Sequence, residues 1–173
     1  VLVDPNSISN VDKIAIEEYS VSKDLNTMVY TFSRNGSDWM ELKSVSLQNG
    51  IHNQDHLRNI RFSQIAWKDD GFFYSSYPKS ELFGKAIGEQ VFYHKIGTNQ
   101  NQDVLVFKRN DPTINFFYMT TKDERFFVLE ECNEAHGIYN YFFIDYERSN
   151  QTLKTLLINI KEELNFYDIA IVY

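Results

Sequence analysis

The sequence has little of what several classes of protein require. Its 173 residues include a single cysteine, Cys132, so no internal disulfide can form, and no CxxC or Cys/His cluster indicates a zinc site. Three prolines and seven glycines are too few for a linker or a low-complexity chain. Every apolar run is far shorter than the ~18 residues of a membrane span. We therefore expect no cofactor, no metal and no membrane partner.

Positive charge is also scarce. The chain has 17 Lys and Arg against 24 Asp and Glu, and its cations form no basic stripe, which argues against a nucleic-acid partner. The opening VLVDPNSIS has no initiator Met and neither the basic nor the apolar segment of a signal peptide. We expect a cytoplasmic location, with the periplasm as the alternative, and a segment taken from a longer protein.

Aromatic residues and a repeated phrase are what the sequence does have. Phe and Tyr account for most of its 16% aromatic residues, and both favour strands. A Lys-Asp phrase occurs as SKDLNTM (22–28), WKDDGFF (67–73) and TKDERFF (121–127), and its first aspartates are 45 and 54 residues apart. Short apolar runs flank each copy. We therefore predict that each copy, including that at Asp69, turns the first strand of a unit into the second.

Turn sequences support this interpretation. Asn35-Gly36 and Asp70-Gly71 are strong hairpin signals, because these residues tolerate positive φ. Four antiparallel strands in a repeat of ~40–45 residues are typical of a β-propeller blade. The longer second interval falls in 77–90 and indicates a long loop. Residues 153–164 have apolar side chains at helical spacing, which alone favours a helix, but the repeat predicts a fourth strand there.

We therefore predict an all-β fold of roughly three to four four-stranded antiparallel blades. The blade units lie around 14–62, 63–110 and 116–162, and the next blade starts at 166–173. Closed propellers have ~4–8 blades, so this chain forms an arc whose end faces are uncovered. Self-association of two arcs into a ring is one alternative for covering them.

Catalytic motifs are missing from the sequence. The glycine pair that has the spacing of a GxSxG nucleophile elbow, Gly84 and Gly88, has Ala86 at its centre, and no phosphate loop, dinucleotide turn or HExxH site occurs. His52 and His56 are four residues apart, but their polar, glycine-broken surroundings favour a solvated loop over a metal site. We expect no catalytic residue in this chain.

Three stretches carry a family resemblance: SRNGSDWMELKSV (33–45), RFSQIAWKDDGFFYSSYP (61–78) and VFYHKIGTNQNQDVLVF (91–107). Together they resemble the N-terminal β-propeller domain of the prolyl oligopeptidase family of serine peptidases. The resemblance implies a parent with a seven-bladed propeller and an α/β-hydrolase domain that holds the catalytic triad. It also implies cleavage of short peptides after proline, with the propeller restricting entry. The expected partners are thus short proline-containing peptides and the parent's own hydrolase domain.

The resemblance also assigns residues. It implies that Phe62 faces the bound peptide, although a core aromatic is the alternative for this position. Asn115 and Ala135 match pocket positions where family members carry a larger apolar residue or a cysteine, so the subsite here is expected to be wider or more polar. A gating loop is implied over 77–90, with Tyr77, Pro78, Gly84 and Gly88, and a structural role for Asp38 and Trp39. The alternative function is a non-catalytic propeller-like scaffold that binds a protein or peptide partner.

Overall fold

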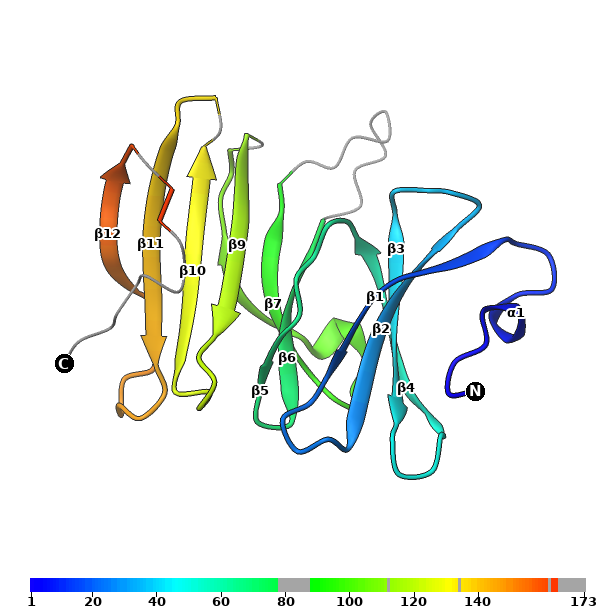
Figure 1. Cartoon of the computed structure of the whole chain (residues 1–173). Coiled ribbons are helices and arrows are strands. Elements are labelled where there is room, and N and C mark those ends of the chain that lie inside the picture. Colours follow the sequence, from blue (N-terminus) through cyan, green and yellow to red (C-terminus); the bar gives the residue numbers. More distant parts are fainter. Residues whose placement is uncertain (78–87, 112, 134, 162, 165–173) are drawn as a thin grey trace. The chain divides into compact units, whose positions relative to one another are not determined.

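The computed structural model describes residues 1–77, 88–111, 113–133, 135–161 and 163–164 (Figure 1). The chain divides into two compact units, Val1–Asn110 and Asp111–Tyr173. Three four-stranded antiparallel sheets account for nearly all regular structure in the described ranges, two of them in the first unit and one in the second. This is the all-β, blade-like fold that the sequence predicts.

Each sheet is a meander in which consecutive strands are hydrogen-bonded neighbours. The first follows a short helix, α1 (Pro5–Ile8), and consists of β1 (Ile14–Val21), β2 (Thr27–Arg34), β3 (Met40–Ser46) and β4 (His52–Ile60). The second consists of β5 (Ala66–Lys68), β6 (Gly71–Ser76), β7 (Gln90–Lys95) and β8 (Val104–Lys108), with a 3₁₀ turn, η1 (Gln100–Gln102), before β8. The third consists of β9 (Ile114–Thr120), β10 (Phe126–Asn133), β11 (Ile138–Asp145) and β12 (Lys154–Ile160).

The Lys-Asp phrase closes the first hairpin of every sheet. In the first sheet, Asp24 accepts hydrogen bonds from the Ser22 hydroxyl at 2.6 Å and from the Asn26 amide at 3.1 Å. In the third sheet, Asp123 accepts the equivalent bonds from Thr121 and from the Arg125 amide. The phrase therefore recurs because its aspartate satisfies the backbone and hydroxyl donors of a tight turn between strands one and two.

The second sheet uses the phrase differently. Lys68 pairs with Gly71, so the two turn residues are Asp69 and Asp70, with Asp69 at φ 51°, and the predicted Asp70-Gly71 turn is wrong by one residue. Gly71 is required for close approach instead, because a Cβ there would lie 2.2 Å from the His94 carbonyl oxygen. The Asn35-Gly36 turn is confirmed, with φ values of 53° and 72°.

Two further predictions meet different outcomes. Residues 154–160 form strand β12, as the repeat predicts. Pairing with β12 satisfies backbone N–H and C=O groups of β11, which a helix in its place would leave without partners. Its Leu156 packs inward against Phe126, Val128 and Phe143. The solvated loop predicted around His52 and His56 is wrong, because both lie on β4, where His56 contacts Glu41.

The two sheets of the first unit share a hydrophobic core. Val29, Leu42, Leu57 and Ile60 come from the first sheet, and Phe72 and Tyr74 from the second, and all are at most 1% exposed. The ring of Phe72 lies 5.4 Å from that of Trp67 and 6.1 Å from that of Tyr74, and the Trp67 indole N–H donates to the Ser20 hydroxyl across the sheets at 2.9 Å. This packing joins the first two blades.

A buried polar network reinforces the same contact. His94 on β7 lies between two carboxylates, with Nδ1 2.7 Å from Asp103 and Nε2 3.1 Å from Asp55 of β4. The three side chains are at most 1% exposed. Asp55 also accepts from the Gly97 amide at 2.6 Å and from Ser44. Because both ring nitrogens face carboxylates, both must donate, and the ring is an imidazolium.

Protonation of His94 predicts a pH dependence of stability. Burial alone would lower the pKa of His94, but the hydrogen bonds and charges of Asp103 and Asp55 raise it to about 9 from an ordinary value of 6.5. The stabilisation is therefore complete below about pH 6.5 and is lost as pH rises through about 9. Urea denaturation is expected to show a falling free energy of unfolding across this range. A flat or rising profile contradicts the imidazolium assignment, and the His94→Gln variant should lack this component of the fall.

Candidate functional site

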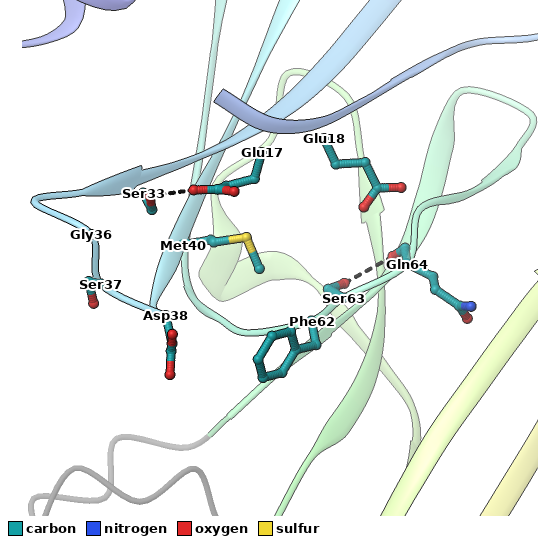
Figure 2. A pocket seen from close by; sticks show the side chains of 10 residues that line it. All are labelled: Glu17, Glu18, Ser33, Gly36, Ser37, Asp38, Met40, Phe62, Ser63 and Gln64. Atoms are coloured by element: carbon teal, nitrogen blue, oxygen red, sulfur yellow. Dashed lines mark hydrogen bonds between the residues drawn. The ribbon is translucent and has the colours of Figure 1, made fainter. Parts of the chain in front are cut away.

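An open pocket of about 410 Å³ lies in the first unit (Figure 2). Its walls come from three places: strand β1, the end of β2 with the turn into β3, and the segment between β4 and β5. The lining residues are Glu17, Glu18, Ser33, Gly36, Ser37, Asp38, Met40, Phe62, Ser63 and Gln64. The sulfur of Met40 lies near the centre of the ring that these side chains form. The pocket thus combines carboxylates, hydroxyls and two apolar side chains.

Phe62 presents an aromatic ring to solvent. It follows β4, has φ 51°, and is 74% exposed, so the alternative that it is a core aromatic is wrong. The Arg61 guanidinium lies 5.1 Å from the centre of the ring, and the same group donates to Asp38 at 2.8 Å. Arg61 therefore neutralises Asp38 while it covers one side of Phe62.

A β-bulge brings two adjacent glutamates to the pocket. Ile16 pairs with Phe32 and Glu18 with Thr31, so Glu17 is an extra residue in β1. Adjacent strand residues normally point to opposite faces, and a bulge suspends this alternation. Glu17 accepts from the Ser33 hydroxyl at 2.5 Å, and partial burial raises the pKa of Glu18. Within the described ranges neither glutamate has a basic side chain at ion-pair distance, whereas Asp38 has Arg61.

The ends of the predicted gating loop are fixed in the first unit. The Tyr77 amide donates to the Asn59 carbonyl at 2.9 Å, and its ring meets that of Trp39 edge-on at 5.9 Å. Burial, with the charge of Glu89 as the second cause, raises the pKa of Tyr77 to about 12. Gly88 has φ 75° just before the buried Glu89, while Pro78 and Gly84 lie outside the described residues.

The other two predicted pocket residues belong to the second unit. Asn115 is half-buried on β9 and pairs with Cys132 of β10. Ala135 is exposed in the turn that follows β10, at the same end of this sheet. Phe62 belongs to the first unit, so the three residues do not form one pocket within a single unit.

The lining of the pocket includes three serines but no histidine, so these residues alone do not form the nucleophile–base pair of a hydrolase. The residues that the structure describes contain no cluster of three metal-ligating side chains. Within those residues, no helix is long and apolar enough to cross a membrane.

Four-stranded antiparallel meanders that pack face to face, as the two sheets of the first unit do, define the chain as part of a β-propeller. Residues 1–169 match the family model of the prolyl oligopeptidase N-terminal β-propeller domain. The chain belongs to the prolyl oligopeptidase family.

Curated relatives agree with this assignment. The chain is 32% identical over 143 residues to a prolyl endopeptidase of Elizabethkingia miricola, covering 79% of this chain and 20% of the relative. It is 34% identical over 151 residues to the prolyl oligopeptidase ophP of Omphalotus olearius, covering 76% of this chain and 20% of the relative. The chain thus spans about a fifth of the length of these relatives.

Solved structures agree on the fold. A prolyl endopeptidase structure is similar with a TM-score of 0.76 at 24% identity, covering 91% of this chain and 22% of the other. Prolyl oligopeptidase B of Galerina marginata, bound to a 35mer hydrolysis and macrocyclization substrate, is similar with a TM-score of 0.74 at 22% identity. The match covers 88% of this chain and 24% of the other. At these identities the likeness shows the propeller fold.

Proposed function

We propose that this chain is the substrate-filtering propeller segment of a serine peptidase that cleaves short peptides after proline. Membership of the prolyl oligopeptidase family over residues 1–169 carries this proposal. The ring of Phe62 supports it, because it lines the pocket and is 74% exposed, so a bound peptide could contact it. The chemistry itself belongs to a hydrolase domain in the same parent protein.

The segment acts by steric selection and by contact. A rigid propeller over an active site admits an extended peptide and rejects a folded protein, and the enclosed space excludes water from the reaction. The shared core and the buried His94 network supply that rigidity between the first two blades. The loop over 77–90 borders the entrance in this proposal, with its ends fixed at Tyr77 and Gly88.

Phe62 packs on substrate residues upstream of the proline, and Asn115 and Ala135 of the second unit line a further subsite. The packed ring stabilises bound peptide by removing apolar surface from water. Because Asn115 is polar and Ala135 is small, we propose that this subsite accepts bulkier or more polar residues than an apolar pocket would.

The Phe62→Ala variant tests this assignment in the full-length protein. Two fluorogenic peptides share the same proline and leaving group, but only one extends three residues upstream. For the extended peptide, kcat/KM is expected to fall about tenfold, a loss of about 1.4 kcal/mol that matches partial burial of one ring. For the short peptide, kcat/KM should change by no more than about twofold, because this peptide does not reach the Phe62 ring.

The comparison of the two peptides separates contact from misfolding. A damaged fold lowers both rates together, and thermal unfolding of the variant measures this directly. Equal losses on both peptides with an unchanged unfolding temperature contradict the contact with Phe62. No post-proline cleavage by the unsubstituted full-length protein contradicts the proposed function itself.

A further inference from the structure

We propose that the pocket beside Phe62 binds a positively charged nitrogen of the peptide substrate, held by Glu18 and Glu17 upstream of the proline. The nitrogen can come from a Lys or Arg side chain or from a free α-amino group. This inference rests on the proposed function and specifies the class of peptide that it prefers.

The pocket is the right kind of cavity for such a group. At about 410 Å³ it holds a long side chain together with water, and it opens within a single compact unit. Glu17 and Glu18 lie on one side, Phe62 lies across from them, and Met40 lies between (Figure 2). A lysine or arginine side chain has the matching form, since an apolar stem contacts rings and thioethers while its charged end reaches carboxylates.

Two of the three carboxylates in the pocket have no basic partner among the described residues. Several acidic side chains elsewhere in the first unit have basic partners, such as Asp12 with Arg34 at 2.8 Å and Asp70 with Lys95. The described residues place no such partner beside Glu17 or Glu18. Glu18 is exposed overall, but partial desolvation still penalises its charge, and a bound cation offsets that penalty. The positively charged nitrogen of the peptide takes the place of the basic side chain that Glu17 and Glu18 lack.

The bulge in β1 allows both glutamates to line the same pocket. In a regular strand, alternation would direct one of the two to the opposite face of β1. Bulges commonly re-aim side chains at binding sites. The bond from Ser33 fixes one oxygen of Glu17, so Glu18 is the one of the two glutamates that accepts no hydrogen bond from another lining residue. Glu18 is therefore the residue that determines the preference.

The test uses the full-length protein and a set of peptides that differ at one upstream position. That position carries Lys, Arg, norleucine or Glu, and each peptide is made with a free and with an acetylated amino end. The ratio of kcat/KM for the Lys peptide to that for the norleucine peptide is expected to be about fivefold, the range of a partly exposed ion pair. In the Glu18→Gln variant this ratio should approach one, and in Glu18→Lys the Glu peptide should become the preferred one.

Each outcome decides the inference. If acetylation alone removes the preference, the pocket binds the α-amino group; if Lys and Arg retain it after acetylation, it binds the side chain. The Glu147→Gln variant is the matched control, because Glu147 is exposed in the other unit, and it should keep the unsubstituted ratio. Equal rates for the Lys, norleucine and Glu peptides contradict the inference while leaving post-proline cleavage intact. Absence of all cleavage instead overturns the proposed function.

Discussion

The Asp55→Ala variant is expected to lose about 3–5 kcal/mol of unfolding free energy, because it leaves three donors of a buried network without their acceptor, each at a cost of about 1–3 kcal/mol. The first of these donors is the Nε2–H of the His94 imidazolium, which is fully buried and keeps Asp103 as its remaining carboxylate. The Gly97 amide and the Ser44 hydroxyl lose their acceptor as well. These groups come from both sheets of the first unit, so the variant weakens the contact between two blades. Urea denaturation at pH 7 measures the loss.

A surface ion pair provides the control for this loss. Asp70 and Lys95 pair with both side chains 60% exposed, so Asp70→Ala is expected to cost at most about 1 kcal/mol. Similar costs for the Asp55 and Asp70 variants would contradict a charged, water-excluded network around His94. At pH 11, where His94 is neutral, the cost of Asp55→Ala is expected to be smaller, and the part that remains measures the hydrogen bonds of Gly97 and Ser44.

The Phe72→Ala variant is expected to cost about 3–5 kcal/mol, the usual range for truncating a buried phenylalanine. Phe72 is fully buried between the two sheets of the first unit, and its ring contacts those of Trp67, Tyr74 and His94. Truncation leaves a cavity where these rings meet, and rigid sheets on both sides limit how far it can close. Thermal and urea denaturation both report this loss.

Phe62→Ala is the matched control for Phe72→Ala. The chemical change is the same, but Phe62 is 74% exposed. The free energy of unfolding of the Phe62→Ala variant should therefore differ by no more than about 0.5 kcal/mol from that of the unsubstituted protein. A large destabilisation by Phe62→Ala would assign this ring to folding instead of substrate contact. A small effect of Phe72→Ala would contradict a tightly packed core between the first two blades.

Much of the fold could be predicted from the sequence because it repeats. The recurring Lys-Asp phrase located the first hairpin of each sheet, and the repeat correctly favoured a strand over a helix at β12. Local turn chemistry was less reliable. The Asp69-Asp70 turn of the second sheet depends on how Lys68 and Gly71 pair, and Gly71 is there to accommodate the His94 carbonyl. Such close approach exists only after β6 and β7 have come together.

The site was less predictable because it depends on long-range contacts. His94 appears isolated in the sequence, and its partner Asp55 is 39 residues away. The sequence does not indicate that Glu17 and Glu18 share a pocket, since adjacent strand residues normally face opposite sides and no local signal predicts the bulge. Phe62 entered through a family resemblance, and only the structure established that its ring is exposed.

The central claim is that this propeller segment filters the substrates of a post-proline peptidase. The most direct measurement offers the full-length protein one proline-containing sequence in two forms, as a short free peptide and as an exposed loop of a small folded protein. Mass spectrometry then identifies the products. The account predicts cleavage on the carboxyl side of proline in the free peptide and an intact folded protein. Equal cleavage of both forms, or no cleavage after proline in either, contradicts it.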